Sequence, residues 1–330
     1  MIPRLRHDFN QRFRPEVYRK MLHSLDACTR THVKLPIAET PCFFPKALLE
    51  EMAATGAGAI QKLVGNEEFL RASRAAIPPQ CRVADEAPHP HFAAADFLLS
   101  QETDGKTVLK LAGLHASPLT FGFQFVLNEV YRSAFELDST LEHLFGGHTE
   151  SSFWKLMERV VLRGHQPEHV VLAGTNLQDR EFFPDVQVIA ERLGVEVEEL
   201  ASLEPEGTRL YYRRSGARVP IYRIYGYFHP AEIGCGQMEL LFDPADSYDV
   251  EWAGHPNWCF HLGGSLARQT AKTECPDSSV MIEAPHGKLK PEVRILYLWP
   301  EAGRLEAILA QVRLISAGKK PAISAAFYSP

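Results

Sequence analysis

A strand–helix–strand pattern in residues 166–205 constrains the fold more than any other feature of the sequence. Residues 170–173, "VVLA", are typical of a strand that is buried on both faces. Pro184 starts a segment with apolar residues at helical spacing, and Gly194 ends it before a second strand, "VEVEEL". Two strands joined through a helix pair in parallel. The pattern therefore predicts an α/β fold built on a Rossmann-like sheet.

Several classes of enzyme are excluded by the motifs that the sequence lacks. The turn after the first strand reads "AGTNLQD" and not G-x-G-x-x-G, which excludes the standard mode of dinucleotide binding. There is no P-loop, no G-x-S-x-G and no H-E-x-x-H. The six cysteines have no C-x-x-C spacing, so we expect reduced thiols and neither a zinc site nor a disulfide framework.

The sequence on either side of this pattern predicts further elements. Before residue 166 helices predominate, and a strand is expected over 107–118. The helix after Pro45 is expected to end near Gly56. After residue 205 the sequence predicts a hairpin through "SGA", and from residue 290 onward it predicts strand, helix and strand. We therefore expect three segments: a helix-rich region 1–165, a Rossmann-like domain 166–270 and a C-terminal lobe 271–330.

Composition bears on location and partners. The net charge of −6 gives no electrostatic reason to expect nucleic acid or an anionic membrane as a partner. The longest apolar runs are strand-sized, and the first twenty residues lack the apolar core of a secretory signal. We expect a cytoplasmic protein that binds a small molecule or a protein partner, and a homo-oligomer is compatible with the sequence.

Arg223 is the first candidate site residue, because it lies in the middle of an aromatic-rich strand, "PIYRIYGYF". A guanidinium in such a strand must emerge at an exposed face or meet an anion, since burying it unpaired is costly. One interpretation makes Arg223 a ligand for a substrate anion. The other makes it an arginine that extends from an exposed strand face.

Glu292 and Arg294 form the second candidate, because residues two apart project from the same face of a strand. Glu292 could hold a divalent cation while Arg294 holds phosphate. The alternative is a structural ion pair. In either case Val293 and Ile295 should face the core.

His255 and Asn257 form the third candidate, on either side of Pro256 in "WAGHPNW". Aromatic, rigid and polar residues alternate here, as in a segment that holds polar side chains beside apolar walls. We expect these side chains to border a cleft, although a histidine in a turn is often only a satisfied structural residue.

The order of several segments resembles a known family. "ETPCFFP", "KLAGLHASP", "LYYRRSGARVPIYRIYG", "VEWAGHPNW" and "PEVRILYLW" follow one another as in an uncharacterised bacterial branch of the ATP-grasp-like proteins. That branch is similar to glutathionylspermidine-synthetase-like and circularly permuted ATP-grasp ligases. The resemblance implies a Rossmann-like pre-ATP-grasp domain and an ATP-grasp-like C-terminal lobe. It also implies activation of a carboxylate with ATP and Mg²⁺, followed by attack of an amine or thiol.

The chain departs from that family at several motif positions. Gly113 stands where relatives carry an acid, and Gly226 and Tyr227 replace an Asn–Arg pair. Gly263 and Gly264 stand where relatives have a lysine. About sixty residues with the Gly-rich loop for the ATP phosphates are reduced to about eleven after "SLARQ", and a C-terminal Asn is missing. The C-terminal lobe is therefore expected to be truncated.

Three hypotheses follow. In the first, the protein is a degenerate ATP-grasp-like protein that binds a ligand or partner without a complete ATP site. In the second, it is an active carboxylate–amine or carboxylate–thiol ligase acting on a small amino-acid, peptide or polyamine substrate. Glu292 would then bind Mg²⁺ and act with Arg294, while Arg223, Lys110, His255 and Asn257 would bind substrate. In the third, it is an interaction protein in which the C-terminal strands expose an apolar face.

Overall fold

The structure is a computed structural model that describes residues 2–101, 107–234, 239–263, 279–316, 318 and 320–329. The α-helices in these residues are α1 (Pro3–Arg12), α2 (Pro15–Thr29), α3 (Lys46–Val64), α4 (Glu67–Ala76), α5 (Phe121–Ala134), α6 (Glu150–Val161), α7 (Phe183–Leu193), α8 (Pro230–Gly234) and α9 (Trp258–Gly263). The strands are β1 (Cys42–Pro45), β2 (Phe92–Gln101), β3 (Thr107–His115), β4 (Val170–Gly174), β5 (Glu196–Glu199), β6 (Glu204–Glu206), β7 (Arg209–Arg214), β8 (Ala217–Ile221), β9 (Arg223–Tyr227), β10 (Glu251–Ala253), β11 (Ile282–Ala284), β12 (Gly287–Leu298), β13 (Glu306–Ile315) and β14 (Ala322–Ser329).

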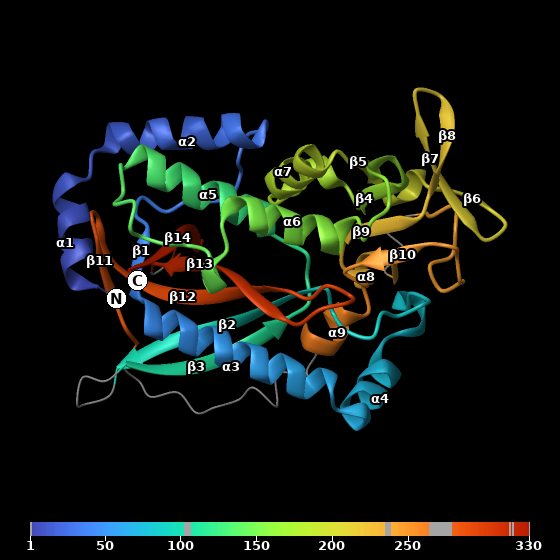
Figure 1. Cartoon of the computed structure of the whole chain (residues 1–330), viewed down its shortest axis with the longest axis horizontal. Coiled ribbons are helices and arrows are strands. Elements are labelled where there is room, and N and C mark those ends of the chain that lie inside the picture. The colour runs from blue at the N-terminus through green and yellow to red at the C-terminus, as the bar shows by residue number, and fades with distance from the viewer. Residues whose placement is uncertain are drawn as a thin grey trace.

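The strands of the described residues form three sheets (Figure 1). The largest has the order β1-β14-β13-β12-β2-β3, with β11 paired to β12. The second has the order β10-β9-β4-β5, and the third the order β6-β7-β8. The two smaller sheets lie within the predicted segment 166–270, whereas the large sheet takes strands from both of the other segments.

The predicted strand–helix–strand unit is present as β4, α7 and β5. β4 and β5 pair in parallel, and Gly194 ends α7 in the left-handed conformation at φ 68°. β9 and β10 also pair in parallel, so the second sheet is wholly parallel. The side chains of α6 and α7 pack on one of its faces and the three-stranded sheet packs on the other, which explains why β4 and β9 are buried throughout.

The large sheet has two different faces. One face is apolar and packs on α3, through residues such as Ala95, Phe97, Val293 and Ile295. The opposite face lies toward α5, with α2 beyond it, as Figure 1 shows. Part of this second face carries polar side chains, and this part lines the candidate site.

The prediction of a helix between the last two strands is wrong, because that stretch forms the strand β13. The apolar residues of "RLEAILAQVRLI" fit a helix by spacing, but in the structure they are buried on both faces of a strand between β12 and β14. An apolar run that is buried on both faces carries no period that separates strand from helix. Pairing with two long neighbours therefore decided the conformation.

The apolar face expected in the interaction-protein hypothesis is also absent from the described residues. β14 pairs with β1 on one side and β13 on the other, and its residues 323–328 are buried. Among all the described residues, the large hydrophobic side chains that are exposed are Tyr222, Leu241 and Met281, which come from separate segments. The strands therefore present neither a free edge at β14 nor a continuous apolar surface.

Gly56 does not end its helix, contrary to the sequence-based expectation. It lies inside α3 at the point of closest approach to the large sheet. A Cβ atom at this position would lie 2.2 Å from the Tyr297 hydroxyl oxygen and 2.7 Å from the Ala95 Cβ atom. The glycine is required by helix–sheet packing and not by backbone conformation.

We expect Gly56→Ala to lower the free energy of unfolding by about 1–3 kcal/mol, because the added methyl group must push α3 away from the sheet. Gly58→Ala is the matched control, since it lies on the exposed side of the same helix and an added Cβ atom would have no neighbour within 4 Å. It should raise stability by about 0.5–1 kcal/mol through helix propensity. Urea unfolding of both variants measures the difference, and equal effects would refute the packing explanation.

Candidate functional site

The polar part of the large sheet begins with the two residues predicted from β12. Val293 and Ile295 are fully buried on the α3 face, so Glu292 and Arg294 project together from the opposite face. The predicted alternation along this strand is therefore confirmed. It places both polar side chains on the face that borders the cleft.

Each of the two residues forms an ion pair with the residue directly opposite on a neighbouring strand. The Arg294 guanidinium donates to both carboxylate oxygens of Asp96 on β2, from Nε at 2.6 Å and from Nη2 at 2.8 Å. Glu292 Oε2 lies 2.8 Å from Nη2 of Arg313 on β13. Glu292 and Arg294 therefore pair with residues of neighbouring strands and not with each other.

Asp96 is the most strongly held carboxylate of this group. Burial alone raises the pKa of Asp96, but hydrogen bonds from Arg294 and His115 outweigh burial and bring the pKa well below its usual range. His115, on β3, approaches Asp96 with Nε2 at 2.9 Å from Oδ2. Asp96 therefore stays ionised and fixes the orientation of the His115 ring.

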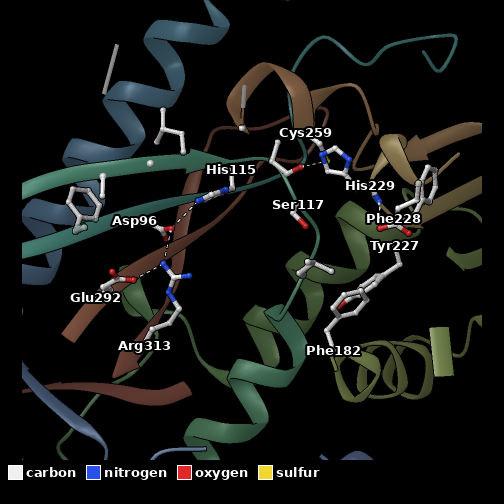
Figure 2. A pocket seen from close by; sticks show the side chains of 18 of the residues that line it. Asp96, His115, Ser117, Phe182, Tyr227, Phe228, His229, Cys259, Glu292 and Arg313 are labelled. Atoms are coloured by element: carbon white, nitrogen blue, oxygen red, sulfur yellow. Dashed lines mark hydrogen bonds and ion pairs between the residues drawn. The ribbon is translucent and has the colours of Figure 1, made fainter. Parts of the chain in front are cut away.

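These side chains line one end of a cleft of about 590 Å³ (Figure 2). Arg294 lies behind Asp96 and is not among the lining residues. The polar lining residues at this end are Asp96, His115, Glu292 and Arg313. The side-chain exposure is 40% for His115 and 35% for Arg313, so both can reach a bound molecule.

The opposite wall comes from the carboxyl end of β9 and the start of α7, as Figure 2 shows for Phe182, Tyr227 and Phe228. The Tyr227 hydroxyl donates a hydrogen bond to Asp185, a fully buried carboxylate in the first turn of α7. Asp185 also accepts hydrogen bonds from the backbone N–H groups of Thr120 and Phe123, both at 2.7 Å. It thereby caps the N-terminus of α5 and holds the aromatic wall in place.

His229 and Glu232 close the far end of the cleft. Glu232 accepts hydrogen bonds from Thr175 and Arg180. Nδ1 of His229 accepts from the backbone N–H of Ala231 at 3.2 Å, and burial lowers the pKa of His229. His229 is therefore neutral near pH 7, with its Nε2–H available as a donor.

Lys110 lies on the same sheet face but outside the cleft lining. It is opposite Leu98 on β2, and Leu98 is opposite Glu292 on β12, so the three form one cross-strand row. With one strand between them, Lys110 and Glu292 are separated by about 10 Å of sheet. The structure therefore places Lys110 beside the cleft.

Arg223 is bound inside the protein and not at the cleft. Its side chain is 1% exposed, and its nitrogens donate to the carbonyls of Val160 and Val161 and to the carboxylates of Glu251 and Glu301. The two carbonyls end α6, where a cation is favourable. Arg223 also starts β9, about 13 Å along the strand from Tyr227 at the cleft. Each nitrogen of the expected substrate ligand therefore already has an internal acceptor.

His255 and Asn257 bind a neighbouring loop, residues 82–91, and do not face the cleft. Nε2 of His255 donates to the Ala84 carbonyl at 2.7 Å, and burial lowers the pKa of His255 to about 4. The Asn257 side chain accepts from the backbone N–H of Val83 and donates to its carbonyl. Contrary to the expectation, these side chains do not line the cleft: the segment clamps one loop to the rest of the protein. Two residues that follow this segment, Cys259 and Gly263, do line the cleft.

Glu86 is the charged centre of this clamp. It contacts His261 at 3.1 Å, Asn257 at 3.1 Å and Arg74 at 2.9 Å. Burial raises the pKa of Glu86, but the hydrogen bond and charge of His261, with the Arg74 and Asn257 contacts, lower it to about 2. Since the folded-state pKa lies below the ordinary value of 4.5, the stabilisation is present above that value.

We therefore expect stability to fall as the pH falls from about 4.5 to about 2, with Glu86 contributing about 1–3 kcal/mol of the loss. Glu86→Gln should destabilise the protein at pH 7 and flatten the pH dependence in this window. The exposed carboxylate Glu158 of α6 offers the control, Glu158→Gln. The free energy of unfolding, measured by chemical denaturation at a series of pH values, tests this prediction. An unchanged pH dependence in Glu86→Gln would refute the role of Glu86 in the clamp.

Sequence reasoning missed several residues of the cleft, chiefly Asp96, His115 and Arg313, and the buried Asp185 behind its aromatic wall. One signal was available: Asp96 is a lone acid in the otherwise apolar strand "FAAADFLLS". A charge in such a position needs a partner. The identity of that partner depends on the pairing of β2 with β12, which are almost two hundred residues apart.

Comparison with known proteins shows the fold. No protein-family model matches the sequence, and no curated protein matches it. Among solved structures, the chain is similar to a glutathione synthetase-like effector from Globodera pallida, in its apo form. The TM-score is 0.58 and the sequence identity 12%, and the alignment covers 96% of this chain and 98% of the other. The chain thus has a mixed α/β fold similar to that of a glutathione synthetase-like protein.

In the part of the chain that the structure describes, none of the helices combines the length and apolar character needed to cross a membrane.

Proposed function

We propose that the protein is a degenerate ATP-grasp-like protein that binds a small molecule in the cleft without ligating it. One observation carries this proposal: each carboxylate at the sheet end of the cleft is held by a cation of the chain itself. Asp96 is held by Arg294 and His115, and Glu292 by Arg313. A cleft with paired, fixed charges is suited to recognising a ligand.

The same arrangement fits Mg²⁺ poorly. A protein-bound Mg²⁺ ion takes carboxylate oxygens in octahedral geometry, usually together with phosphate oxygens and water. Among the described residues there is no group of three or more His, Cys, Asp or Glu side chains that could hold a metal ion. The described residues around Glu292 therefore do not fit the ion, and we assign no step to it.

The described residues also offer little to a triphosphate. In a parallel sheet, the turn after a central strand is a common site for anions, because its backbone N–H groups point outward. Here Glu199 occupies that position after β4, accepting from Asn176 N–H at 2.7 Å and Leu177 N–H at 2.8 Å. Arg294 is likewise committed to Asp96.

Two finer interpretations belong to this proposal. We interpret the sheet β10-β9-β4-β5 as a Rossmann-like pre-ATP-grasp domain, and strands β11–β14 as the remnant of a truncated ATP-grasp-like lobe. The glutathione synthetase-like fold supports the first. The proposed junction of the truncation, at residues 270–280, falls almost entirely outside the described residues.

A ligand screen tests the proposal. Thermal unfolding would be followed with pools of amino acids, small peptides, carboxylic acids and polyamines, each with and without ATP and Mg²⁺, while ADP release is assayed. We expect stabilisation by at least one pool without nucleotide, and no ADP release. The stabilisation should be lost in Arg313→Met and kept in Arg213→Met, an exposed arginine of the β7–β8 hairpin. ADP release with any pool would instead establish the active ligase.

A further inference from the structure

We propose that the sheet end of the cleft binds a carboxylate, and that His115 takes up a proton when the carboxylate binds. This inference rests on the proposed function, since it names the ligand class and the electrostatic rule of the same cleft. It follows from the donors that Arg313 leaves unused and from the second ring nitrogen of His115.

Arg313 has donor capacity to spare. Its contacts with Glu292 and Asp96 both use Nη2, at 2.8 Å and 3.4 Å. Its Nε is buried and has no hydrogen-bond partner, and the hydrogen bonds and ion pairs of Arg313 with described residues use Nη2 and not Nη1. A buried donor without a partner is costly, and a ligand that reorients the guanidinium would relieve that cost. A carboxylate matches the planar arrangement of guanidinium donors, because its two oxygens can accept two parallel hydrogen bonds.

The second group, His115, has a fixed tautomer. Asp96 is ionised and accepts from Nε2, so this nitrogen carries the proton in the neutral ring. The free nitrogen, Nδ1, then presents a lone pair and repels a carboxylate. Only the protonated ring presents an N–H group at Nδ1. Anion binding beside His115 therefore requires a proton, whereas an ammonium ligand would require its absence.

The charges around His115 favour this coupling. Without the proton, Asp96 is balanced by Arg294 and Glu292 by Arg313, so this end of the cleft has no net charge. One proton makes it positive and attractive to an anion. The other titratable groups that line the cleft are Tyr227 on β9, His229 in the turn after it, Glu232 on α8 and Cys259 on α9, while Lys110 on β3 lies beside the cleft and outside its lining. His229 is kept neutral near pH 7 and Cys259 remains a thiol, because burial lowers the pKa of the first and raises that of the second to about 12.

The far wall suggests a suitable probe. Phe182, Tyr227 and Phe228 offer aromatic surface within the same cleft. Phenylacetate carries a carboxylate on an aromatic body, while phenylacetamide and phenethylamine supply a neutral and a cationic analogue of the same size. Because the phenylacetate carboxyl is ionised above about pH 5.5, changes in its affinity above that pH report on the protein.

The experiment is isothermal titration of the full chain with phenylacetate between about pH 5.5 and 8.5. We expect affinity to fall by up to about tenfold per pH unit once His115 loses its proton. Titration at one pH in two buffers of different ionisation enthalpy should show uptake of up to about one proton. Phenylacetamide should bind at least about tenfold more weakly than phenylacetate at low pH.

Two variants test whether His115 is the group that takes up the proton. His115→Gln keeps a donor toward Asp96 but does not titrate, so binding should become independent of pH. His229→Gln is the matched control in the same cleft and should retain the pH dependence. Circular dichroism and thermal unfolding would confirm that both variants fold.

The outcomes separate this inference from the proposed function. Preferential binding of phenethylamine, or a pH dependence that survives His115→Gln, would overturn the inference while leaving a ligand-binding cleft. Failure of every probe here and of every pool in the ligand screen would overturn both.

Discussion

Replacing Arg223 with methionine should lower the free energy of unfolding by about 3–5 kcal/mol. The substitution removes a cation that is 1% exposed, takes one of the cationic partners of Glu301 away and leaves the two carbonyls at the end of α6 without the donors of Arg223. Burial lowers the pKa of Arg223, and the charges of Glu301 and Glu251 oppose that effect. These charged groups therefore stabilise the fold only when all of them are present. Removing one of them lowers the free energy of unfolding more than removing an exposed ion pair does.

Arg213→Met provides the comparison for this prediction. Arg213 is more than half exposed and contacts Glu204 at 2.6 Å and 3.2 Å, so its loss should change the free energy of unfolding very little. The measurement is denaturant unfolding of both variants and wild type. If Arg223→Met is as mild as Arg213→Met, or if it abolishes ligand binding while leaving stability unchanged, the structural role assigned to Arg223 is wrong.

Replacing Asp185 with asparagine should cost about 2–4 kcal/mol, the second large effect. Asp185 accepts from two backbone N–H groups of the α5 N-terminus and from the Tyr227 hydroxyl. The ionised carboxylate accepts with both oxygens, whereas an asparagine side chain would turn a donor toward one of these donors, so the comparison applies above about pH 7. Tyr227→Phe removes a single hydrogen bond and should cost about 1 kcal/mol. The exposed Asp179→Asn should have little effect, and thermal unfolding of all three variants gives the ranking.

Asp185 also makes a prediction about pH. Burial raises its pKa to about 7, although backbone hydrogen bonds from Phe123, Thr120 and Gly122 lower it. A carboxyl with a folded-state pKa above the ordinary 3.8 binds its proton more tightly when folded, so its contribution to stability declines as the pH rises from about 4 to about 7. This slope should vanish in Asp185→Asn. A slope that persists would assign it to another group.

The elements that the sequence predicted best are those whose type and ends are determined by residues close by in the sequence. β4, α7 and β5 follow from an apolar run, Pro184 and Gly194, and the two faces of β12 follow from the alternation of Glu292, Val293, Arg294 and Ile295. These patterns hold because strand geometry and helix ends are set by neighbouring residues. The prediction of a helix at β13 was wrong, because the apolar residues there have no period that distinguishes a strand from a helix.

The candidate site was less predictable, because its partners come from distant segments. Arg294 meets Asp96 and Glu292 meets Arg313 only once the order β13-β12-β2 is known. Arg223 finds its acceptors at the end of α6 and in the turn after β12. His255 and Asn257 find theirs in residues 82–91. In each case the sequence identified a polar group that needs a partner, but not which partner it has.

Calorimetric titration of ATP with Mg²⁺ into the full chain tests the central claim most directly, namely that the cleft binds a small molecule without a complete nucleotide site. We predict no saturable binding in the micromolar range, because Asp96, Glu292 and Arg294 are committed to partners within the sheet. Micromolar binding of the Mg²⁺–ATP complex, weakened by Glu292→Gln, would contradict the proposal and favour the active-ligase alternative.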